Sequence, residues 1–270
     1  MSDRVRFTIT DGVADVRLNR PEKRNAIDLA MLDALISTGE ALAADGSVLA
    51  VVLSGEGRSF CAGLDLGAFG SDGGKNGTLG DGFAARALSR RDGRMVSVAQ
   101  ESVAVWSALP VPVIAAVHGH ALGGGLQLAL AADIRFVAPD AQFSVLEIRW
   151  GLVPDMTGSQ VLPDLVGRDV AKELTFTGRM VTGDEAVRIG LATRLCDSPL
   201  DDALALARQI TEKSPSAIRA AKELLDMAGR VPMEEGLLAE QAAQARMIGS
   251  ADQMEAITAF FEGRAPRWPR

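Results

Sequence analysis

The chain begins with two short segments in which apolar and polar residues alternate. Residues 5–10 and 13–18 show the period of two that is typical of half-buried strands, and Asp11-Gly12 between them is a common turn dipeptide. This pattern predicts a β-hairpin. Apolar residues then recur every three or four positions over residues 27–42, which predicts a helix.

Three continuous apolar runs, at residues 48–53, 112–117 and 134–138, have the length and the β-branched content of buried strands. A helix is predicted at about 124–132, between the last two runs. Strands that alternate with helices are typical of an α/β fold with crossover connections. The sequence therefore predicts an α/β fold.

A glycine-rich stretch over residues 67–94 predicts a loop that leads into a helix over about 84–108. This loop is either an exposed connector or a lid over a site, and the sequence favours neither. Helical periodicity dominates the last third of the chain. The helices predicted there cover residues 169–176, 184–190, 200–213, 216–228, 233–248 and 251–262.

Composition excludes several classes of protein. The 270 residues carry 28 Lys and Arg against 35 Asp and Glu, and aromatic residues make up only 4%, which argues against a nucleic-acid partner. Two cysteines are too few for a disulfide framework or a four-cysteine zinc site. The first ten residues lack the apolar stretch that is typical of a signal peptide, and no apolar run approaches the ~20 residues of a membrane span. We therefore expect a soluble, cytoplasmic protein that does not bind a membrane.

Residues 58–66 follow the first buried-type strand and contain Gly63. A small-residue turn of this kind brings backbone N–H groups close to a ligand, although glycine turns at strand ends are also common without any function. Cys61 lies in this turn. Neither histidine is near it in sequence, so we expect a buried, inert thiol rather than a nucleophile.

The residues Gly123-Gly124-Gly125 open the helix predicted at 124–132. The N-terminus of a helix offers unpaired N–H groups to an anion, but the spacing matches neither the Walker A loop nor the dinucleotide fingerprint. His118 and His120 precede these glycines without a nearby carboxylate or cysteine. We expect them to be structural, and we expect no metal site.

Glu147 and Asp155 are the acidic residues of an otherwise largely apolar segment. Apolar surroundings disfavour the charged form of a carboxyl group, so its pKa rises towards that of a useful proton shuttle. The alternative is that Glu147 forms a surface ion pair with Arg149. This segment alone does not separate the two interpretations.

Several of these segments together resemble the crotonase superfamily, which has the enoyl-CoA hydratase/isomerase fold. The resemblance rests on residues 18–27, 60–66, 123–125, 154–160 and 259–262, in the same order along nearly the whole chain. It implies a spiral core of four ββα turns over residues 1–198 and a C-terminal helical trimerisation region over residues 199–270. It also implies a homotrimer, or a hexamer made of two trimers, with a coenzyme A thioester as substrate and no separate cofactor.

The resemblance also implies positions for the site residues. The backbone N–H groups of Leu64 and Gly124 correspond to the oxyanion hole, which stabilises the enolate oxygen of a thioester; one such donor contributes roughly 2.7–4 kcal/mol. Coenzyme A is expected near Arg24, Ala26, Ile27, Ala62 and Asp65. Arg24 is either a phosphate ligand or a solvated arginine. Gly263 stands where relatives often have lysine, so a phosphate contact from the last helix would come from Arg264 or be absent.

Hydratases of this family place two glutamates around a water molecule. By the resemblance Glu147 fills the second position, but Gln127 occupies the first. An amide cannot take a proton from water, and general base catalysis contributes about 10²–10⁴-fold. Efficient two-glutamate hydration is therefore not expected, although Gln127 can still orient a water molecule.

Isomerases that resemble this sequence work with one glutamate. Asp155 stands where dienoyl-CoA isomerases place a second acid, although those enzymes also carry an acid at the position of Gln127. The leading interpretation is double-bond isomerisation of an enoyl- or dienoyl-CoA, with Glu147 as general acid and base. The alternatives are an enoyl-CoA hydratase and a non-catalytic acyl-CoA-binding protein. A serine-protease-like site is discounted, because Ser59, Ser144 and the two histidines show no recognisable arrangement.

Overall fold

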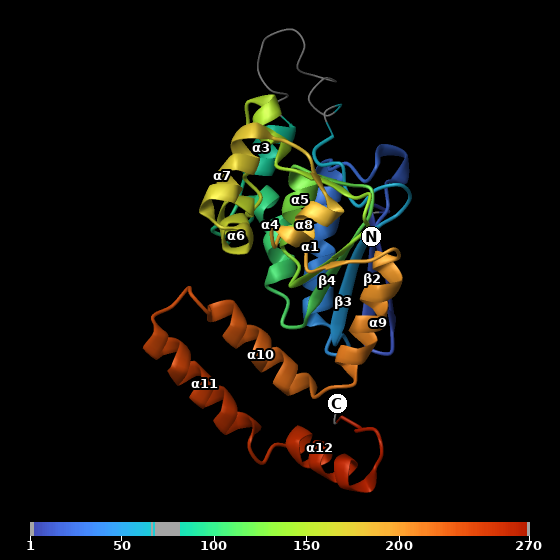
Figure 1. Cartoon of the computed structure of the whole chain (residues 1–270), viewed down its shortest axis with the longest axis vertical. Helices are drawn as coiled ribbons and strands as arrows, with labels where there is room; N and C mark the ends of the chain where they lie inside the picture. The colour runs from blue at the N-terminus through green and yellow to red at the C-terminus, as the bar shows by residue number, and fades with distance from the viewer. Residues whose placement is uncertain (1–2, 66, 68–81, 269–270) are drawn as a thin grey trace.

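The computed structural model describes residues 3–65, 67 and 82–268. Two regions are visible in Figure 1: an α/β core that contains the sheets, and three C-terminal helices that extend away from it. Residues 68–81 of the glycine-rich stretch lie outside the described residues. Whether that stretch is an exposed connector or a lid therefore stays open.

A six-stranded sheet forms the centre of the core, in the order β1-β2-β3-β4-β6-β9. Its strands are β1 (Val5–Thr10), β2 (Val13–Leu18), β3 (Ala50–Gly55), β4 (Val113–Val117), β6 (Ile134–Val137) and β9 (Arg194–Leu195). The first pair is the predicted hairpin, whose turn residues Asp11 and Gly12 both have positive φ. All other pairs are parallel, as expected of an α/β fold.

A second, smaller sheet contains β5 (His120–Leu122), β7 (Gln142–Ser144) and β8 (Val181–Thr182). Two isolated parallel bridges, Ile27–Leu64 and Cys61–Ala121, extend the same layer toward the N-terminal part of the chain. Each of the strands β2, β3, β4 and β6 is thus followed by a bridge or strand of this layer and then by helix. This repetition confirms the predicted spiral of four ββα turns.

Helices pack on both faces of the large sheet. The helices of the core are α1 (Leu29–Ala44), α3 (Phe83–Leu88), α4 (Val98–Ser107), α5 (Gly124–Leu130), α6 (Gly158–Val166), α7 (Arg168–Thr177), α8 (Gly183–Arg188) and α9 (Pro199–Thr211), together with the short 3-10 helices η1 (Pro21–Lys23) and η2 (Leu146–Trp150). α1, α4 and α5 contribute to the main hydrophobic core, whereas α9 packs its Ala203 and Ala207 on the opposite face of the sheet.

The single helix predicted over residues 84–108 is wrong, because α3 ends at Leu88 and α4 begins only at Val98. Ser89 ends α3 in an extended conformation, and Gly93 further along adopts a positive φ of 75° that does not belong to a helix. Ser97 then starts α4 with a capping box, in which its side chain and that of Gln100 each accept a backbone N–H of the other residue. α6 was not predicted at all.

The C-terminal helices α10 (Pro215–Met227), α11 (Met233–Met247) and α12 (Ala251–Glu262) lie where helices were predicted. α9 belongs to the core by its packing, so the part that projects from the core begins at α10 (Figure 1). Lys222 of α10 forms an ion pair of 2.5 Å with Asp133 of the core. Among the described helices, none is long and apolar enough to cross a membrane.

Candidate active site

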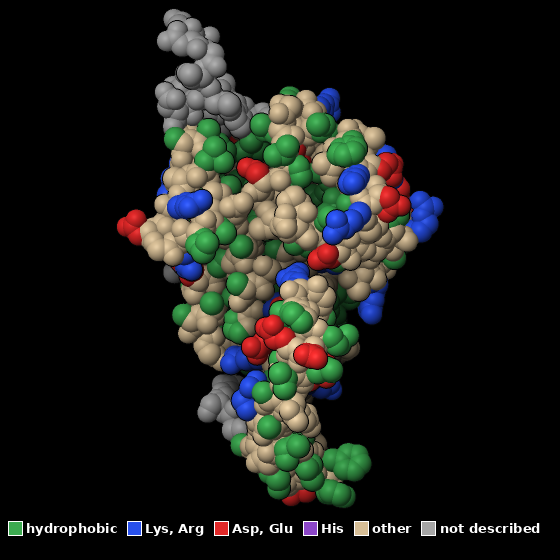
Figure 2. Space-filling view, turned by 90° about the vertical axis from the view of Figure 1, so that its left-hand side faces the viewer, with side chains coloured by type: hydrophobic (Ala, Val, Ile, Leu, Met, Phe, Trp, Pro, Cys, Tyr) green, Lys and Arg blue, Asp and Glu red, His purple; other side chains and the backbone are tan. Residues whose placement is uncertain are grey.

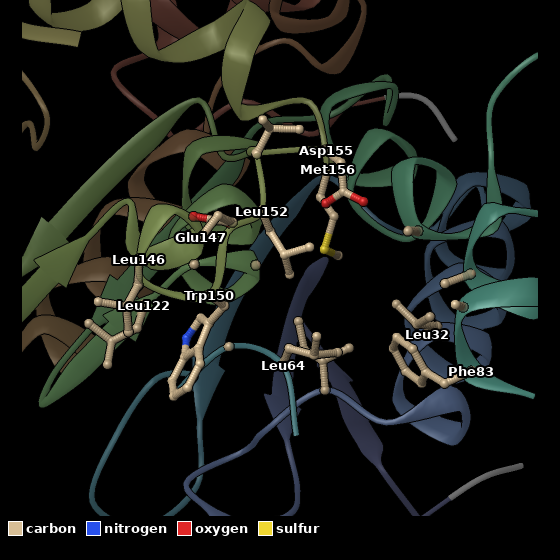
Figure 3. Close-up of a pocket in the computed structure, with 18 of the residues that line it drawn as sticks. Leu32, Leu64, Phe83, Leu122, Leu146, Glu147, Trp150, Leu152, Asp155 and Met156 are labelled. Carbon is tan, nitrogen blue, oxygen red and sulfur yellow. The ribbon is translucent and has the colours of Figure 1, made fainter. Parts of the chain in front are cut away.

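A cavity of about 310 Å³ lies beside the layer that contains the small sheet and the two bridges, and α3 and the 3-10 helix η2 also line it (Figure 3). Its walls are mostly apolar and come from the turn at 62–64, the start of α5 at 122–124, the 3-10 helix η2 and the segment 152–156. Figure 3 shows Leu32 and Phe83 on the side opposite Leu122. These segments are the ones that the sequence had singled out separately.

Glycines allow the backbones of the first two segments to touch. Gly63 has a φ of +83°, and a Cβ added there would collide with the carbonyl oxygen of Leu122. A Cβ on Gly125 would likewise collide with the carbonyl oxygen of Cys61. The position of the missing Cβ of Gly63 is 3.7 Å from the Gly124 nitrogen, so the two predicted oxyanion donors belong to adjoining backbone segments.

The N–H groups of Leu64 and Gly124 have no acceptor among the described residues. Ile27 bonds to the residues on either side of Leu64, through its N–H to Gly63 and its carbonyl to Asp65, so the Leu64 N–H points away from that strand bridge. Gly124 is the first residue of α5 and has no helical partner for its N–H. Both residues line the cavity. The pair can therefore donate two hydrogen bonds to a ligand oxygen.

Glu147 lies on η2 and is only 8% exposed. Its Oε1 accepts a hydrogen bond of 2.6 Å from Gln127 Nε2, and its buried Oε2 has no partner among the described residues. Burial raises the pKa of this carboxyl above its ordinary value, as expected for a proton shuttle. The alternative ion pair with Arg149 is wrong, because the Arg149 guanidinium lies over the Trp150 ring instead.

Asp155 also lines the cavity, beside Met156 and apart from Glu147 (Figure 3). Asp155 is an exposed residue, whereas Glu147 is buried. Burial by the cavity walls raises its pKa, and its negative charge further raises the pKa of Glu147. The cavity is thus lined by two carboxyl groups whose pKa values are both raised above the ordinary value.

Gln127 is not among the residues that line this cavity. Its side chain is 2% exposed and lies behind Glu147, where Oε1 accepts the backbone N–H groups of Met156 at 2.8 Å and Gly158 at 2.9 Å. The described hydrogen bonds therefore engage both ends of the amide with protein groups.

The predicted coenzyme A residues divide into two groups. Ala26 is buried, and Ile27 and Ala62 line the cavity. Arg24 has an exposed side chain without an ion pair to a described carboxylate, while its carbonyl oxygen accepts the Ala62 N–H at 2.9 Å. Asp65, by contrast, has its carboxylate 2.7 Å from a guanidinium nitrogen of Arg20.

Arg264 does not have a vacant guanidinium. It forms ion pairs of 2.5 Å with Glu255 and with Glu262. A phosphate contact from this residue would have to replace at least one of these pairs. Of the two candidate phosphate ligands, Arg24 is therefore the better placed.

Sequence reasoning missed Asn25, which is fully buried. Its Oδ1 accepts the Arg20 N–H, and its Nδ2 donates to the carbonyl oxygens of Glu56, Ser59 and Phe60. Asn25 has a φ of +57°, a conformation that asparagine adopts more readily than most residues. The signal that could have found it is the asparagine itself, since asparagine tolerates a left-handed turn and its amide can bond to several backbone groups.

The surroundings of Cys61 and His118 are those of structural side chains. Cys61 is fully buried, and burial raises the pKa of its thiol to about 12, so it is an inert thiol. His118 Nε2 lies 3.0 Å from the Gly57 carbonyl oxygen. Within the described part of the chain, no group of three or more His, Cys, Asp or Glu side chains is arranged to hold a metal ion.

One arrangement was not foreseen. Ser59 Oγ lies 3.0 Å from His120 Nδ1, although the sequence showed no serine–histidine arrangement. Ser59 is fully buried and is not among the residues that line the cavity. The pair is a structural hydrogen bond and does not change the view that a protease-like site is absent from the described residues.

Residues 8–270 match the profile of the family described as Enoyl-CoA hydratase/isomerase. Together with the ββα spiral, this match shows that the chain belongs to the enoyl-CoA hydratase/isomerase family of the crotonase superfamily. It is thus an enzyme of that family. Members of the family use coenzyme A thioesters as substrates without a separate cofactor.

Named relatives include both reaction types. The chain is 34% identical over 264 residues to the mitochondrial methylglutaconyl-CoA hydratase of Mus musculus, covering 95% of this chain and 79% of the relative. It is 37% identical over 257 residues to the mitochondrial Delta(3,5)-Delta(2,4)-dienoyl-CoA isomerase of Rattus norvegicus, covering 93% and 76%. The crystal structure of enoyl-CoA hydratase from Bacillus anthracis superposes with a TM-score of 0.87 at 31% identity, covering 98% of each chain. The choice of reaction therefore depends on the site itself.

Proposed function

We propose that this protein is an enoyl-CoA or dienoyl-CoA isomerase. Glu147 moves a proton along the acyl chain while the N–H groups of Leu64 and Gly124 hold the enolate oxygen. The observation that carries the proposal is the environment of Glu147, a buried carboxyl with an unpartnered Oε2 beside an apolar cavity. Its nearest polar neighbour is an amide rather than a second carboxylate.

The proposed reaction needs one base and one oxyanion hole. The ionised Glu147 carboxylate takes a proton from C2 of a 3-enoyl thioester, and the electron pair of that C–H bond moves to the thioester oxygen. Two N–H donors stabilise the negative charge where it develops. Glu147 then returns the proton to C4, and the double bond ends between C2 and C3. One C–H bond breaks and one forms, so the reaction needs no cofactor.

A dienoyl thioester requires the proton to reach a more distant carbon. Asp155 lines the same cavity and is the candidate for a second acid in that case. Two carboxyl groups in different surroundings can hold different protonation states, which allows one to accept a proton while the other donates one. The greater burial of Glu147 supports this division of roles.

Hydration of a 2-enoyl-CoA is the alternative, and the presence of hydratases among the relatives favours keeping it. In that reaction Gln127 would orient the water molecule. Its hydrogen bonds to Glu147, Met156 and Gly158 argue against this role, because they engage both ends of its amide. A non-catalytic acyl-CoA-binding protein is the further alternative.

Two assays on the purified protein distinguish these functions. One follows conversion of 3-enoyl-CoA to 2-enoyl-CoA, and the other follows addition of water to 2-enoyl-CoA. We expect isomerisation to be the faster reaction and to depend on Glu147. Hydration at ordinary enzymatic rates that survives Gln127→Ala would contradict the proposal. Binding of acyl-CoA without Glu147-dependent turnover would identify a non-catalytic protein.

We also propose that α10–α12 form the interface of a homotrimer or of a hexamer made of two trimers. Figure 2 shows apolar side chains gathered on this projecting part of the molecule. The exposed apolar residues of α10–α12 include Leu225, Met233, Leu238, Phe260 and Phe261, all more than 60% exposed in the single chain. A second copy would cover this surface.

The cytoplasmic location stays a prediction.

A further inference from the structure

We propose that Gln127 is a positioning residue, which holds the carboxyl of Glu147 at a fixed place relative to the segment that carries Asp155. The inference rests on the proposed function, because it assigns Gln127 a part in proton transfer. Gln127 would thus act by positioning the Glu147 carboxyl rather than by orienting a water molecule.

The orientation of the Gln127 amide is determined by its neighbours. Two backbone N–H groups, those of Met156 and Gly158, point at the same Gln127 oxygen. A flipped amide would set its NH₂ group against these two donors and leave them unpaired in a buried place. The NH₂ group must therefore point away from them, towards Glu147.

This orientation makes the two oxygens of Glu147 different. Oε1 accepts the Gln127 N–H at 2.6 Å and so remains an acceptor in every protonation state of Glu147. Oε2 is buried without a partner among the described residues. A proton that Glu147 gains or loses is therefore carried by Oε2, and the direction of proton transfer is fixed by the hydrogen bond on the opposite oxygen.

One side chain also connects the two acids of the cavity. Gln127 bonds to Glu147 at one end and, at the other, to the N–H of Met156, the residue next to Asp155. Displacing this amide would move Glu147 relative to Asp155 and to the oxyanion donors. A displacement of about 1 Å can cost on the order of 10²-fold in rate.

Gly158 provides the space for this arrangement. A Cβ added there would lie 2.7 Å from the Cγ and Oε1 atoms of Gln127, closer than real contacts allow. The φ of Gly158 is not in the left-handed region, so its backbone conformation accepts alanine. Gly158→Ala thus displaces the amide by steric contact without removing it.

The first test replaces the donor but keeps the acceptor. Gln127→Glu can still accept both backbone N–H groups, but it places a second carboxyl beside Glu147. The added charge raises the pKa of Glu147. Since the base must be ionised, the acid limb of kcat for isomerisation should move to higher pH. Gln160→Glu, the same chemical change on the exposed surface of α6, is the matched control and should leave the profile unchanged.

The second test is a double-mutant cycle. Gly158→Ala and Gln127→Ala should each lower kcat by about 10–10²-fold, with a smaller change in KM. In the Gln127→Ala background, the Gly158→Ala substitution should have no further effect, because the side chain that it displaces is gone. Independent, additive effects would overturn the proposal.

The titration of Glu147 gives a readout that does not require turnover. Its carboxyl stretch in infrared difference spectra, assigned by its loss in Glu147→Gln, should titrate at higher pH in Gln127→Glu than in the wild type. A titration that is unchanged in Gln127→Glu overturns the positioning role. Absence of Glu147-dependent isomerisation in the wild type, with the shifted titration present, would instead overturn the proposed function alone.

Discussion

The Arg20 guanidinium lies 2.7 Å from the Asp65 carboxylate and joins the loop before α1 to the turn that carries Leu64. The same guanidinium donates to the Ala26 carbonyl oxygen at 3.0 Å and lies 3.5 Å from the Asp28 carboxylate. Through Arg20, Asp65 thus holds in place the turn at 62–64, which carries the Leu64 N–H of the proposed oxyanion hole. Residues 18–21, part of the segment that resembles the family, therefore support the backbone of the site.

Arg20→Ala should destabilise the protein by about 1–3 kcal/mol, because it removes the guanidinium from the half-buried Asp65 carboxylate and from the buried Ala26 carbonyl oxygen. The Arg20 side chain is only 11% exposed, so water cannot fully replace it. Chemical denaturation measures the loss. Arg4→Ala, which removes a more exposed partner of Asp28, should cost less. Equal losses in the two variants would contradict this role for Arg20.

Asp65 should contribute stability that depends on pH. Partial burial works to raise the pKa of its carboxyl, but hydrogen bonds from Arg20 and from the Gly67 N–H outweigh burial and lower it. A lowered pKa in the folded state stabilises the fold above the unfolded pKa, and this contribution is lost as pH falls through the folded value. Asp65→Asn should therefore flatten the acid side of the curve of unfolding free energy against pH. A curve that keeps its wild-type slope would argue against the pair.

Gly63→Ala should impair both stability and turnover. The positive φ and the collision with the Leu122 carbonyl oxygen cost about 1–3 kcal/mol, and relief of the collision moves the adjacent Leu64 N–H. Thermal unfolding and kcat measure the two effects. Gly46→Ala is the matched control, since nothing lies within 4 Å of a Cβ there. Wild-type kcat in Gly63→Ala would exclude the Leu64 N–H from the oxyanion hole.

Glu147→Gln should stabilise the protein at neutral pH, by about 0.5–2 kcal/mol. Burial raises the pKa of Glu147. The wild type therefore loses stability as pH rises from the unfolded pKa through the folded one, whereas glutamine has no charge to bury. Urea unfolding at pH 4 and pH 8 tests this. The gain should appear at the higher pH and be absent from Glu212→Gln, which changes an exposed residue.

Arg24→Ala should raise KM for an acyl-CoA without changing kcat. The side chain is exposed and has no ion pair with a described carboxylate, so it is able to contact a phosphate. A contact of about 0.5–1.5 kcal/mol corresponds to roughly a 2–10-fold increase in KM. The effect should decrease at high salt and be absent with a short thioester that lacks the nucleotide. A KM that stays at the wild-type value would show that Arg24 is solvated.

Phe261→Asp should disrupt the proposed oligomer. Phe260 and Phe261 are each 80% exposed in the single chain, and a buried charge at an interface costs several kcal/mol. Light scattering after size-exclusion chromatography should report a trimer or hexamer for the wild type and a smaller species for the variant. A monomeric wild type would contradict the assembly.

Much of the fold was predictable because its signals are local. The hairpin, the buried strands and the C-terminal helices follow from periodicity, turn residues and apolar runs. The break between α3 and α4 was not recognised, because the signals that separate the two helices, Gly93 and the capping box of Ser97, each act at a single position. The fold prediction therefore failed where a few single residues, rather than the periodicity of a whole segment, decide where a helix ends.

The site was less predictable. Glu147 and Asp155 could be selected from composition, since charge in an apolar segment is unusual. The link from Gln127 to Met156 and Gly158 joins residues 29 and 31 positions apart, and the Arg20–Asp65 pair spans a comparable distance along the chain. Such contacts depend on how the spiral stacks its turns, which no local pattern contains.

The most direct measurement compares the wild type with Glu147→Gln in the conversion of 3-enoyl-CoA to 2-enoyl-CoA. Loss of the general base should reduce kcat by about 10²–10⁴-fold. Binding of acyl-CoA and the folded state should be retained, as checked by titration and thermal unfolding. Turnover by Glu147→Gln at the wild-type rate would contradict the account, because the reaction would then use a different base.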